Sequence, residues 1–574
     1  MRAAFTLLAA LAASAPLFAR PDDVGGGASE VARSNYEKAE IAREEGRLAE
    51  AVPFYKAAIE AFPSYVDAHA GFLECLRGLG DASAARELYA TLAASNPSSL
   101  EVRLFRAASM PPQEAIPVLA ALAQEVPTSE RIHLELGRSQ LEGGAVRDAE
   151  KSLRLAIKLK SDFVSARILL GDISLRDGKA ATARKEYEAA LEFDPSSAAT
   201  QIRLAYCLHK QDKTDRAVES LTRLLSEGNF PRYAAGYWML AVIQAEAGQG
   251  KKALDALDKL LALAPKHLHA LIAKGQLLLQ ENQPLEAVKV FTAATEAKPD
   301  SALAVFCLGW ANEKAADSPE IRQEERLKRV EAAVAAYQKC AEMEQRARVR
   351  DSLGFAFLLK QDQREATTQF KRARDLDPSF AAAENNLGLV EDISDNRAEA
   401  MKRYQNVIDK IDKKNVRAMV MLALDHWIQG SPPKGVTLLQ AALKIDPTDD
   451  LAWTFLGDIQ YDLKKFKEAV NSYEKATEIN PKNFIAWYHM GIALEEDLKK
   501  YEEAEKAYRS ALDARADPPP DLILRLAELN DVDFFDRLEE ALRFYELYVS
   551  VGGTEPWVPE RIKELKDYFA GGGK

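Results

Sequence analysis

The chain has 574 residues and a formal net charge of -12, and Ala, Leu, Glu and Lys recur evenly along its length. These residues favour helices, so we expect an all-α protein. The acidic balance argues against a nucleic-acid-binding protein, because such a protein needs a basic face to neutralise phosphates. The four cysteines show no metal-site spacing, and we expect them in the helical core: Cys75, Cys207, Cys307 and Cys340.

The N-terminal segment 1–19 has the layout of a secretory signal peptide. Arg2 supplies a short positive region, and residues 3–15 form a small, apolar stretch that is too short to span a bilayer. We place the cleavage site after Ala19. Residues 20–31 contain a proline and three consecutive glycines, which is typical of a flexible linker. The alternative is an apolar tail that stays on the chain.

Residues 32–555 carry a pattern that recurs about every 34 residues. In the clear periods a glycine or alanine is followed by an alanine, an aromatic residue or leucine and a second small residue, and a proline often closes the period. Small residues let paired helices approach closely, and proline ends the second helix because it cannot continue it. Three periods show the pattern: Gly171, Ala183, Tyr187, Ala190 and Pro195; Gly275, Ala287, Phe291, Ala294 and Pro299; Gly457, Ala469, Tyr473, Ala476 and Pro481.

In these residues the chain resembles the tetratricopeptide-repeat (TPR) family. The resemblance implies an all-α TPR solenoid, a right-handed superhelix of about 15 helix-turn-helix repeats over residues 32–555. Residues 556–574 then form a C-terminal capping helix and tail, because the ends of a solenoid need a polar cap. The segment 98–127 is a shortened unit, and 521–555 is a divergent last one. The clear repeats begin near residues 32, 66, 130, 164, 198, 234, 268, 302, 347, 381, 416, 450 and 484.

The repeat that begins near residue 302 is irregular, because its next small residue, Ala333, arrives about 12 residues late. Ser318 and Pro319 are typical of a helix start. We therefore expect a second helix that is about three turns longer than in the other repeats, with a charged extension over 319–330. The extension is either a tolerated surface feature or a docking spur for a partner.

The resemblance also implies a concave groove lined by the first helix of each repeat. In the first repeats the groove-facing places hold charged residues, among them Glu40, Arg43, Glu74 and Arg77. Later repeats mix aromatic and acidic residues, namely Asp458, Tyr461, Asp462, Tyr488, Glu495 and Glu496. Between them, repeats 6 to 12 hold apolar and aromatic residues: Tyr206, Trp238, Val242, Ile272, Phe306, Trp310, Phe355, Leu389, Leu424 and Trp427.

Aromatic side chains dominate binding hot spots, so we expect these ten residues to hold an extended or helical segment of a partner protein. The alternative is that they pack against one another across a tightly wound superhelix.

The sequence contains no nucleophile elbow, phosphate loop or dinucleotide-binding glycine motif. His267 and His269 lie close in sequence, but no third metal ligand is near them. We therefore expect no enzyme activity, no cofactor and no metal site. The resemblance implies that the partners are proteins or peptide segments and not nucleic acid.

Together these features predict a non-catalytic protein–protein interaction scaffold in the periplasm or cell envelope of a bacterium. It would assemble or stabilise a motility, pilus or export complex, with other envelope proteins as partners and no transmembrane span in the mature chain. Two alternatives stay open: a cytosolic adaptor similar to a co-chaperone, and the regulatory subunit of an enzyme complex.

Overall fold

The computed structural model describes residues 29–44, 47–79, 81, 83–227, 234–318, 321–515, 517–531 and 537–571. The predicted signal peptide 1–19 and most of the predicted linker lie outside these residues. Over the described ranges all regular structure is helical and no strand forms, which confirms the all-α class. None of the described helices combines the length and the apolar character needed to cross a membrane.

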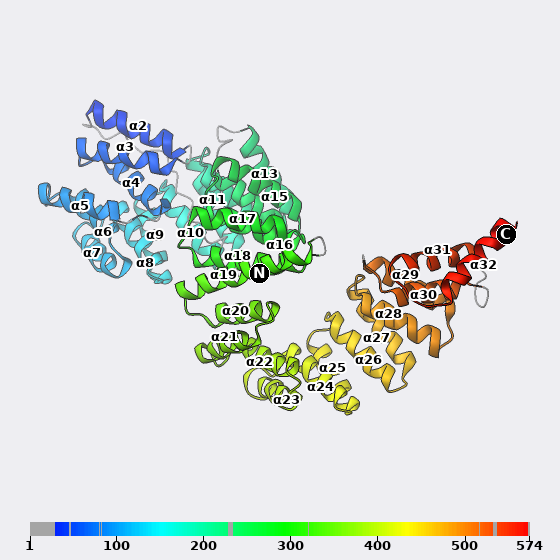
Figure 1. Cartoon of the computed structure of the whole chain (residues 1–574). Helices are drawn as coiled ribbons and strands as arrows, with labels where there is room; N and C mark the ends of the chain where they lie inside the picture. The colour runs from blue at the N-terminus through cyan, green and yellow to red at the C-terminus, as the bar shows by residue number, and fades with distance from the viewer. Residues whose placement is uncertain are drawn as a thin grey trace. The chain divides into compact units, whose positions relative to one another are not determined.

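The chain divides into two compact units, Met1–Pro319 and Glu320–Lys574. The helices of the first unit are α2 (Glu30–Glu44), α3 (Leu48–Ala61), α4 (Val66–Leu79), α5 (Ser83–Ser95), α6 (Leu100–Ala108), α7 (Pro112–Glu125), α8 (Glu130–Glu142), α9 (Val146–Leu159), α10 (Val164–Arg176), α11 (Ala180–Phe193), α12 (Ala198–His209), α13 (Thr214–Glu227), α14 (Ala234–Glu246), α15 (Gly250–Leu263), α16 (Leu268–Gln280), α17 (Pro284–Ala297) and α18 (Ala302–Ala316) (Figure 1).

The second unit contains α19 (Gln323–Met343), α20 (Ala347–Leu359), α21 (Gln363–Leu376), α22 (Ala381–Ile393), α23 (Arg397–Asn406), α24 (Val416–Ile428), α25 (Pro432–Ile445), α26 (Asp450–Asp462), α27 (Phe466–Ile479), α28 (Phe484–Ile492), α29 (Tyr501–Ala514), α30 (Pro520–Asn530), α31 (Leu538–Ser550) and α32 (Val558–Ala570). Two short π-helical segments continue helices of this unit, namely η1 (Val407–Ile411) after α23 and η2 (Ala493–Asp497) after α28.

Consecutive helices pack as pairs, and the first helix of a pair also contacts the first helix of the next pair, as α12 contacts α14 and α20 contacts α22. The first helices of most repeats begin where the sequence pattern begins: Val66, Glu130, Val164, Ala198, Ala234, Leu268, Ala302, Ala347, Ala381, Val416, Asp450 and Phe484. The periodicity therefore encodes the helix pairs themselves. Within each unit, neighbouring pairs contact one another, so the core of each unit is a series of clusters along the stack.

Several helix pairs are held together by a ring of the second helix that packs on a glycine of the first. A Cβ added at Gly275 would lie 2.5 Å from the Phe291 ring, and one added at Gly457 would lie 2.5 Å from the Tyr473 ring. Any side chain larger than hydrogen would displace the second helix. The rings themselves are fully buried, and burial of one such side chain contributes about 1.5–3 kcal/mol.

Many first helices start at a residue whose side chain caps the helix. Ser129 and Ser301 accept a hydrogen bond from the backbone amide three residues later, as do Asp449 and Asn483. Such a cap satisfies one of the backbone donors that the first turn leaves free, and it contributes about 1 kcal/mol. The proline-containing turn and the cap together fix where one repeat ends and the next begins.

The irregular repeat differs from the expectation in length. Helix α19 has 21 residues, against 14 in α17, so it is longer by about two turns rather than three. It starts at Gln323, with Arg322 as its N-cap, and not at Ser318. Further extra residues lengthen α18, which has 15 residues against 13 in α16.

The two π segments absorb single extra residues. Tyr508 lies 17 residues after Gly491, whereas Tyr473 lies 16 residues after Gly457, yet both rings pack on their glycines. The extra residue falls in η2, where the helix widens to take it up. Segments of this kind are frequent at functional sites.

Candidate partner-binding surfaces

Charged side chains on the first helices of the N-terminal repeats pair with one another. Arg43 on α2 lies 3.3 Å from Glu74 on α4, and Arg138 on α8 lies 3.7 Å from the same carboxylate. Arg77 on α4 lies 3.1 Å from Glu135 on α8. Arg43, Arg138 and Glu135 are at most 7% exposed. The charges predicted to line a groove here therefore engage each other.

The two carboxylates of this network respond differently to their surroundings. Burial raises the pKa of Glu74 more than the neighbouring arginines lower it. Burial alone would also raise the pKa of Glu135, but attraction to Arg138, Arg77 and Arg131 exceeds that effect and lowers the pKa. The network ties the first helices α2, α4 and α8 together, and its arginines are already occupied by carboxylates of the same chain.

Six of the ten predicted groove residues lie in the first unit, and four of them are buried. Their exposed fractions are small: 7% for Tyr206, 6% for Trp238, 1% for Val242 and 3% for Ile272. These side chains belong to the hydrophobic clusters of α12 to α18. For these four residues the expectation of an open groove is corrected to a packed core, because adjacent first helices lie close together. Phe306 and Trp310 are partly exposed.

The other four predicted residues lie in the second unit and are all partly exposed. Phe355 is on α20, Leu389 on α22, and Leu424 and Trp427 are on α24. The indole Nε1 of Trp427 donates to Asp462 Oδ2 at 2.9 Å. The last residues of α22 and α24 add more exposed apolar surface, with Ile393 51% and Ile428 61% exposed.

A tyrosine–carboxylate hydrogen bond recurs within the repeats, and it was not predicted. The buried tyrosine of the second helix donates to a carboxylate of the first: Tyr187 to Asp172 at 2.6 Å, Tyr404 to Asp392 at 2.7 Å, Tyr473 to Asp458 at 2.8 Å, Tyr508 to Glu495 at 2.6 Å and Tyr545 to Asp531 at 3.0 Å. A carboxylate 15 residues before the tyrosine is the signal in the sequence, at Asp172 and Asp458.

The carboxylate of this bond usually meets a basic side chain from the next first helix. Arg203 Nε lies 3.0 Å from Asp172, and His489 Nδ1 lies 2.7 Å from Asp458. In the same way Arg525 meets Glu495 at 2.9 Å, and Arg561 meets Asp531. The carboxylate therefore links the second helix of its own repeat to the first helix of the next.

In one repeat the carboxylate meets a second acid from the next first helix instead of a base. The next first helix after Asp392 is α24, and its Asp425 is 4% exposed. Burial and the neighbouring charge of Asp392 raise the pKa of Asp425 to about 7. The carboxyl groups of Asp392 and Asp425 hydrogen-bond to each other, which adds to the rise in the pKa of Asp425.

The last repeats combine aromatic rings and acids on their first helices. Arg525 on α30 lies 2.8 Å from Glu496 and 3.4 Å from Asp521, and the Tyr488 hydroxyl hydrogen-bonds to Asp521. Glu496 and Asp521 remain 48% and 61% exposed. This part of the second unit is therefore acidic and open to solvent.

The histidines have structural positions. His69 Nε2 lies 2.9 Å from the carbonyl oxygen of Pro63, and the ring stacks on Phe105. His267 caps α16, accepting a hydrogen bond from the amide of Ala270. Among the described residues no group of three His, Cys, Asp or Glu side chains could hold a metal ion. The four cysteines are buried and free.

Comparison with known proteins finds the same repeat. Profiles described as tetratricopeptide repeat match residues 2–66, 134–198 and 272–343, residues 42–108 and 174–237, and residues 485–518; one described as TPR repeat matches 457–497. Together these matches cover more than half of the chain.

Curated relatives are distant and partial. The chain is 22% identical over 116 residues to the peroxisomal targeting signal receptor of Candida glabrata, covering 20% of each chain. It is 24% identical over 262 residues to Superkiller protein 3 of Schizosaccharomyces pombe, covering 42% of this chain and 18% of that one. The chain thus matches about a fifth of the length of these relatives.

Among solved structures, yeast Tom70 is similar with a TM-score of 0.39 at 16% identity, covering 77% of this chain and 96% of that chain. The repeat profiles, the helix pairs and the ring-on-glycine packing of several repeats lead to one conclusion: the chain belongs to the tetratricopeptide-repeat family.

Proposed function

We propose that this chain is a non-catalytic protein-interaction scaffold, exported to the bacterial cell envelope, where it assembles or stabilises a motility, pilus or export complex. The observation that carries the interaction role is the partly exposed apolar row on α20, α22 and α24, made of Phe355, Leu389, Leu424 and Trp427. Exposed apolar surface on successive elements marks sites where proteins associate.

The non-catalytic part of the proposal rests on architecture. Nearly all described residues belong to helix pairs or to the turns between them. Acids whose pKa is raised above its ordinary value by burial, such as Glu74 and Asp425, lie between first helices. These positions explain the groups as parts of the repeat stack rather than as parts of a reaction centre.

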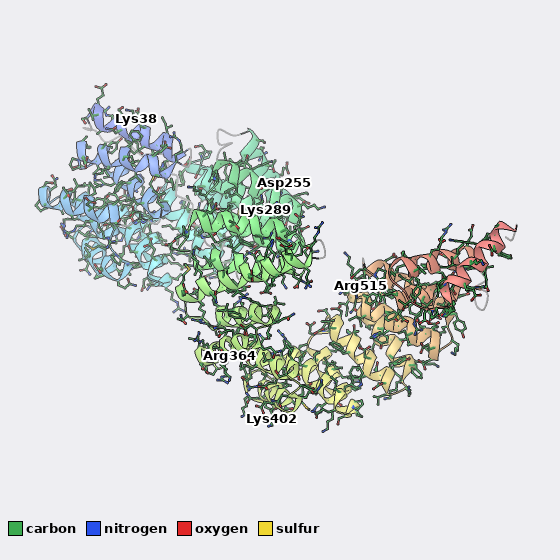
Figure 2. The ribbon with its side chains drawn as sticks, in the orientation of Figure 1. Lys38, Asp255, Lys289, Arg364, Lys402 and Arg515 are labelled. Atoms are coloured by element: carbon green, nitrogen blue, oxygen red, sulfur yellow. The ribbon has the colours of Figure 1, made fainter. Side chains whose placement is uncertain are left out.

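The interaction role is tested by site-specific crosslinking. A photo-reactive phenylalanine analogue placed at Leu389 or Leu424 is expected to capture the same partner protein from an envelope fraction. The matched control is Lys402 on α23, whose side chain is 74% exposed and points away from the ribbon (Figure 2). Equal capture from position 402, or capture from none of the three, contradicts the proposed surface.

Export rests on the pattern of residues 1–19 and is tested by the mature N-terminus. Mass spectrometry of the chain from fractionated source cells is expected to find Arg20 as the first residue, in the envelope or periplasmic fraction. A chain that keeps Met1 in the cytosolic fraction rejects export and leaves the interaction role standing.

A cytosolic adaptor is the second candidate, and one observation favours it. The repeat profile that matches residues 2–66 includes the predicted signal peptide and linker. Residues that belong to a repeat are retained in the mature protein, whereas a signal peptide is removed. The same measurement of the N-terminus therefore decides between the two candidates.

A further inference from the structure

Arg350 on α20 has no carboxylate partner among the residues that the structure describes. Its guanidinium donates to Gln369 Oε1 on α21 at 3.1 Å and to Gln345 Oε1 in the preceding connection at 3.1 Å. It also donates to the carbonyl oxygen of Ala341, near the end of α19, at 3.4 Å. All three acceptors are neutral, so the charge of Arg350 is not balanced where α19, α20 and α21 meet.

An earlier repeat has a carboxylate in this position. Arg167 is the fourth residue of α10, as Arg350 is of α20, and it lies 3.7 Å from Glu186 on α11. Glu186 is the seventh residue of α11, and the seventh residue of α21 is Gln369. The same ring-on-glycine packing holds both helix pairs, so the two positions correspond. The carboxylate that balances the arginine in one repeat is therefore a neutral amide in the other.

The repeat that follows α21 has the same pair with its signs reversed. Glu384, the fourth residue of α22, lies 3.2 Å from Arg403, the seventh residue of α23. In both comparison repeats an acid and an arginine face each other between the first and the second helix. In the repeat of Arg350 only the arginine of such a pair is present.

A second arginine lies beside Arg350. Arg372 is on α21, three residues after Gln369, and residues three apart lie on the same face of a helix. Burial and the charge of Arg372 lower the pKa of Arg350, and Glu342 acts in the opposite direction. Within the described part of the chain the Arg372 side chain makes no hydrogen bond and no ion pair. Arg372 is exposed and Arg350 is partly exposed, so an outside group can reach both.

The surroundings of the two arginines are basic. The nearby acids have partners of their own, since Glu344 lies 3.1 Å from Arg346 and Asp375 lies 2.9 Å from Arg374. Residues 346–374 hold eight arginines and lysines against three aspartates and glutamates, in a chain whose net charge is -12. A basic region on an acidic protein directs an acidic partner to that region, because the rest of the surface repels it.

The chemistry of the pair favours a carboxylate. Each guanidinium presents its N–H donors in a planar fork that matches the two oxygens of a carboxylate. A glutamate or aspartate from outside restores the pair that Arg167 makes with Glu186. It also relieves the repulsion between Arg350 and Arg372.

We infer that Arg350 and Arg372 bind a glutamate or aspartate side chain of a partner protein at the junction of α19, α20 and α21. The carboxylate accepts hydrogen bonds from both guanidinium groups, while Gln345 and Gln369 hold Arg350 in position. The inference rests on the proposed interaction role and deepens it, because it names the chemistry of a contact that the apolar row does not supply. It is independent of export.

The test uses the full chain and two peptides that carry the same uncharged fluorophore. The peptides share a Gly-Ser framework and differ only at two adjacent positions, which hold glutamate or glutamine. Fluorescence anisotropy is expected to show that the glutamate peptide binds about tenfold more tightly than the glutamine peptide, which corresponds to about 1.4 kcal/mol. Inorganic phosphate, added at constant ionic strength, is expected to displace the glutamate peptide only weakly.

The variant Arg350→Gln with Arg372→Gln removes both charges from the site. Glutamine is compatible with the first position, because Gln201 is the fourth residue of α12 and donates to the carbonyl oxygen of Pro195 at 2.9 Å. The variant is expected to abolish the preference for glutamate over glutamine, with an unchanged helix content by circular dichroism.

The matched control is Lys467→Gln with Lys506→Gln, which removes two exposed charges on α27 and α29 and changes the net charge equally. This control is expected to keep the preference for glutamate.

A further variant fills the site from within the chain. Gln369→Glu places a carboxylate opposite Arg350, as Glu186 stands opposite Arg167. It is expected to remove most of the preference for glutamate and to raise the midpoint of urea unfolding. Because this variant keeps both arginines, the loss identifies a carboxylate as the group that the site binds.

Several results overturn the inference. One is an unchanged preference for glutamate in the variant without the two arginines, or in Gln369→Glu. Another is an equal loss in the lysine control, which assigns the effect to net charge. Displacement by phosphate at concentrations below that of the glutamate peptide makes a free oxyanion the ligand. A dimer of the full chain, seen by sedimentation velocity, that the arginine variant dissociates makes a second copy the source of the carboxylate.

The outcome is separable from that of the proposed function. If crosslinking at Leu389 captures a partner but the peptides bind equally, the interaction role stands and the carboxylate site is rejected. If the glutamate preference is found but crosslinking captures nothing, the carboxylate site stands and the apolar surface is rejected.

Discussion

At the scale of single residues, the recurring bond between a buried tyrosine and a carboxylate has different charged neighbours in different repeats. At Asp172 the carboxylate is balanced by Arg203, which is 3% exposed. At Asp392 the next first helix brings Asp425 close, so two acids face each other in a poorly solvated place. The same bond between a tyrosine and a carboxylate therefore meets a base in one repeat and a second acid in another.

Replacing Asp425 by Asn is expected to stabilise the protein at pH 8. In the folded chain the pKa of Asp425 is about 7, above the ordinary value of about 3.9, so folding favours the protonated form. The stability that protonated Asp425 contributes is fully present below about pH 4 and is lost as the pH rises through about 7. Urea unfolding, followed by tryptophan fluorescence, should show a gain of about 1–3 kcal/mol at pH 8 and a smaller one at pH 5.

The comparison variant is Asp172→Asn, which is expected to lower the free energy of unfolding instead of raising it. Removing this carboxylate leaves Arg203 buried without its charge partner, which is strongly destabilising. If both substitutions shift the unfolding midpoint in the same direction, the difference between the two repeats does not lie in their charge balance.

At the scale of helices, the buried ion network connects α2, α4 and α8, which are not consecutive in the chain. Glu74 on α4 stands between Arg43 and Arg138, the two arginines that belong to the outer helices of this group. Its removal leaves two buried cations with fewer partners. The network therefore joins three helices through a single carboxylate.

Replacing Glu74 by Gln is expected to cost about 3–5 kcal/mol in the free energy of unfolding. Hydrogen exchange should report the loss as faster exchange in α2, α4 and α8. Because the ions are buried, added salt should change the effect little. The surface pair Arg103–Glu125 is the control, since both side chains are at least 40% exposed. There, Glu125→Gln is expected to cost about 0–1 kcal/mol, and a similar cost at both sites would contradict a buried network.

The helices also show what could be predicted from the sequence. Their starting residues follow from the prolines, the caps and the small residues, which act within one repeat. The burial of Tyr206 and Val242 could not be predicted, because it depends on how closely neighbouring first helices pack. The partner of Glu74 is 64 residues away, at Arg138, and no local pattern indicates such a pair.

At the scale of the whole molecule, the two units each have hydrophobic clusters of their own. The first unit has clusters around Phe105, Trp238 and Phe291, and the second has clusters around Leu439 and Tyr473. In a stack of repeats, stability is approximately the sum of the repeats and of the interfaces between neighbours. Since each unit has its own clusters, we expect each unit to fold by itself.

Fragments 29–318 and 321–571, expressed separately, are expected to be helical and to unfold cooperatively. Circular dichroism and thermal unfolding measure both properties. A fragment pair cut within a helix, after Tyr237 in α14, serves as the control and is expected to lose helicity in the repeat that is cut. If 321–571 is unfolded by itself, the second unit depends on the first.

The π segments η1 and η2 have a consequence for how the gene can change. Each takes up an extra residue locally, so the repeats that follow keep their packing, and Asn415 still caps α24 four residues after η1 ends. Where a π segment forms, it takes up the register shift from one inserted residue within the same repeat. The helices of the following repeats then keep their packing. Such a protein can vary in length one amino acid at a time, and each insertion rotates only the side chains beside it.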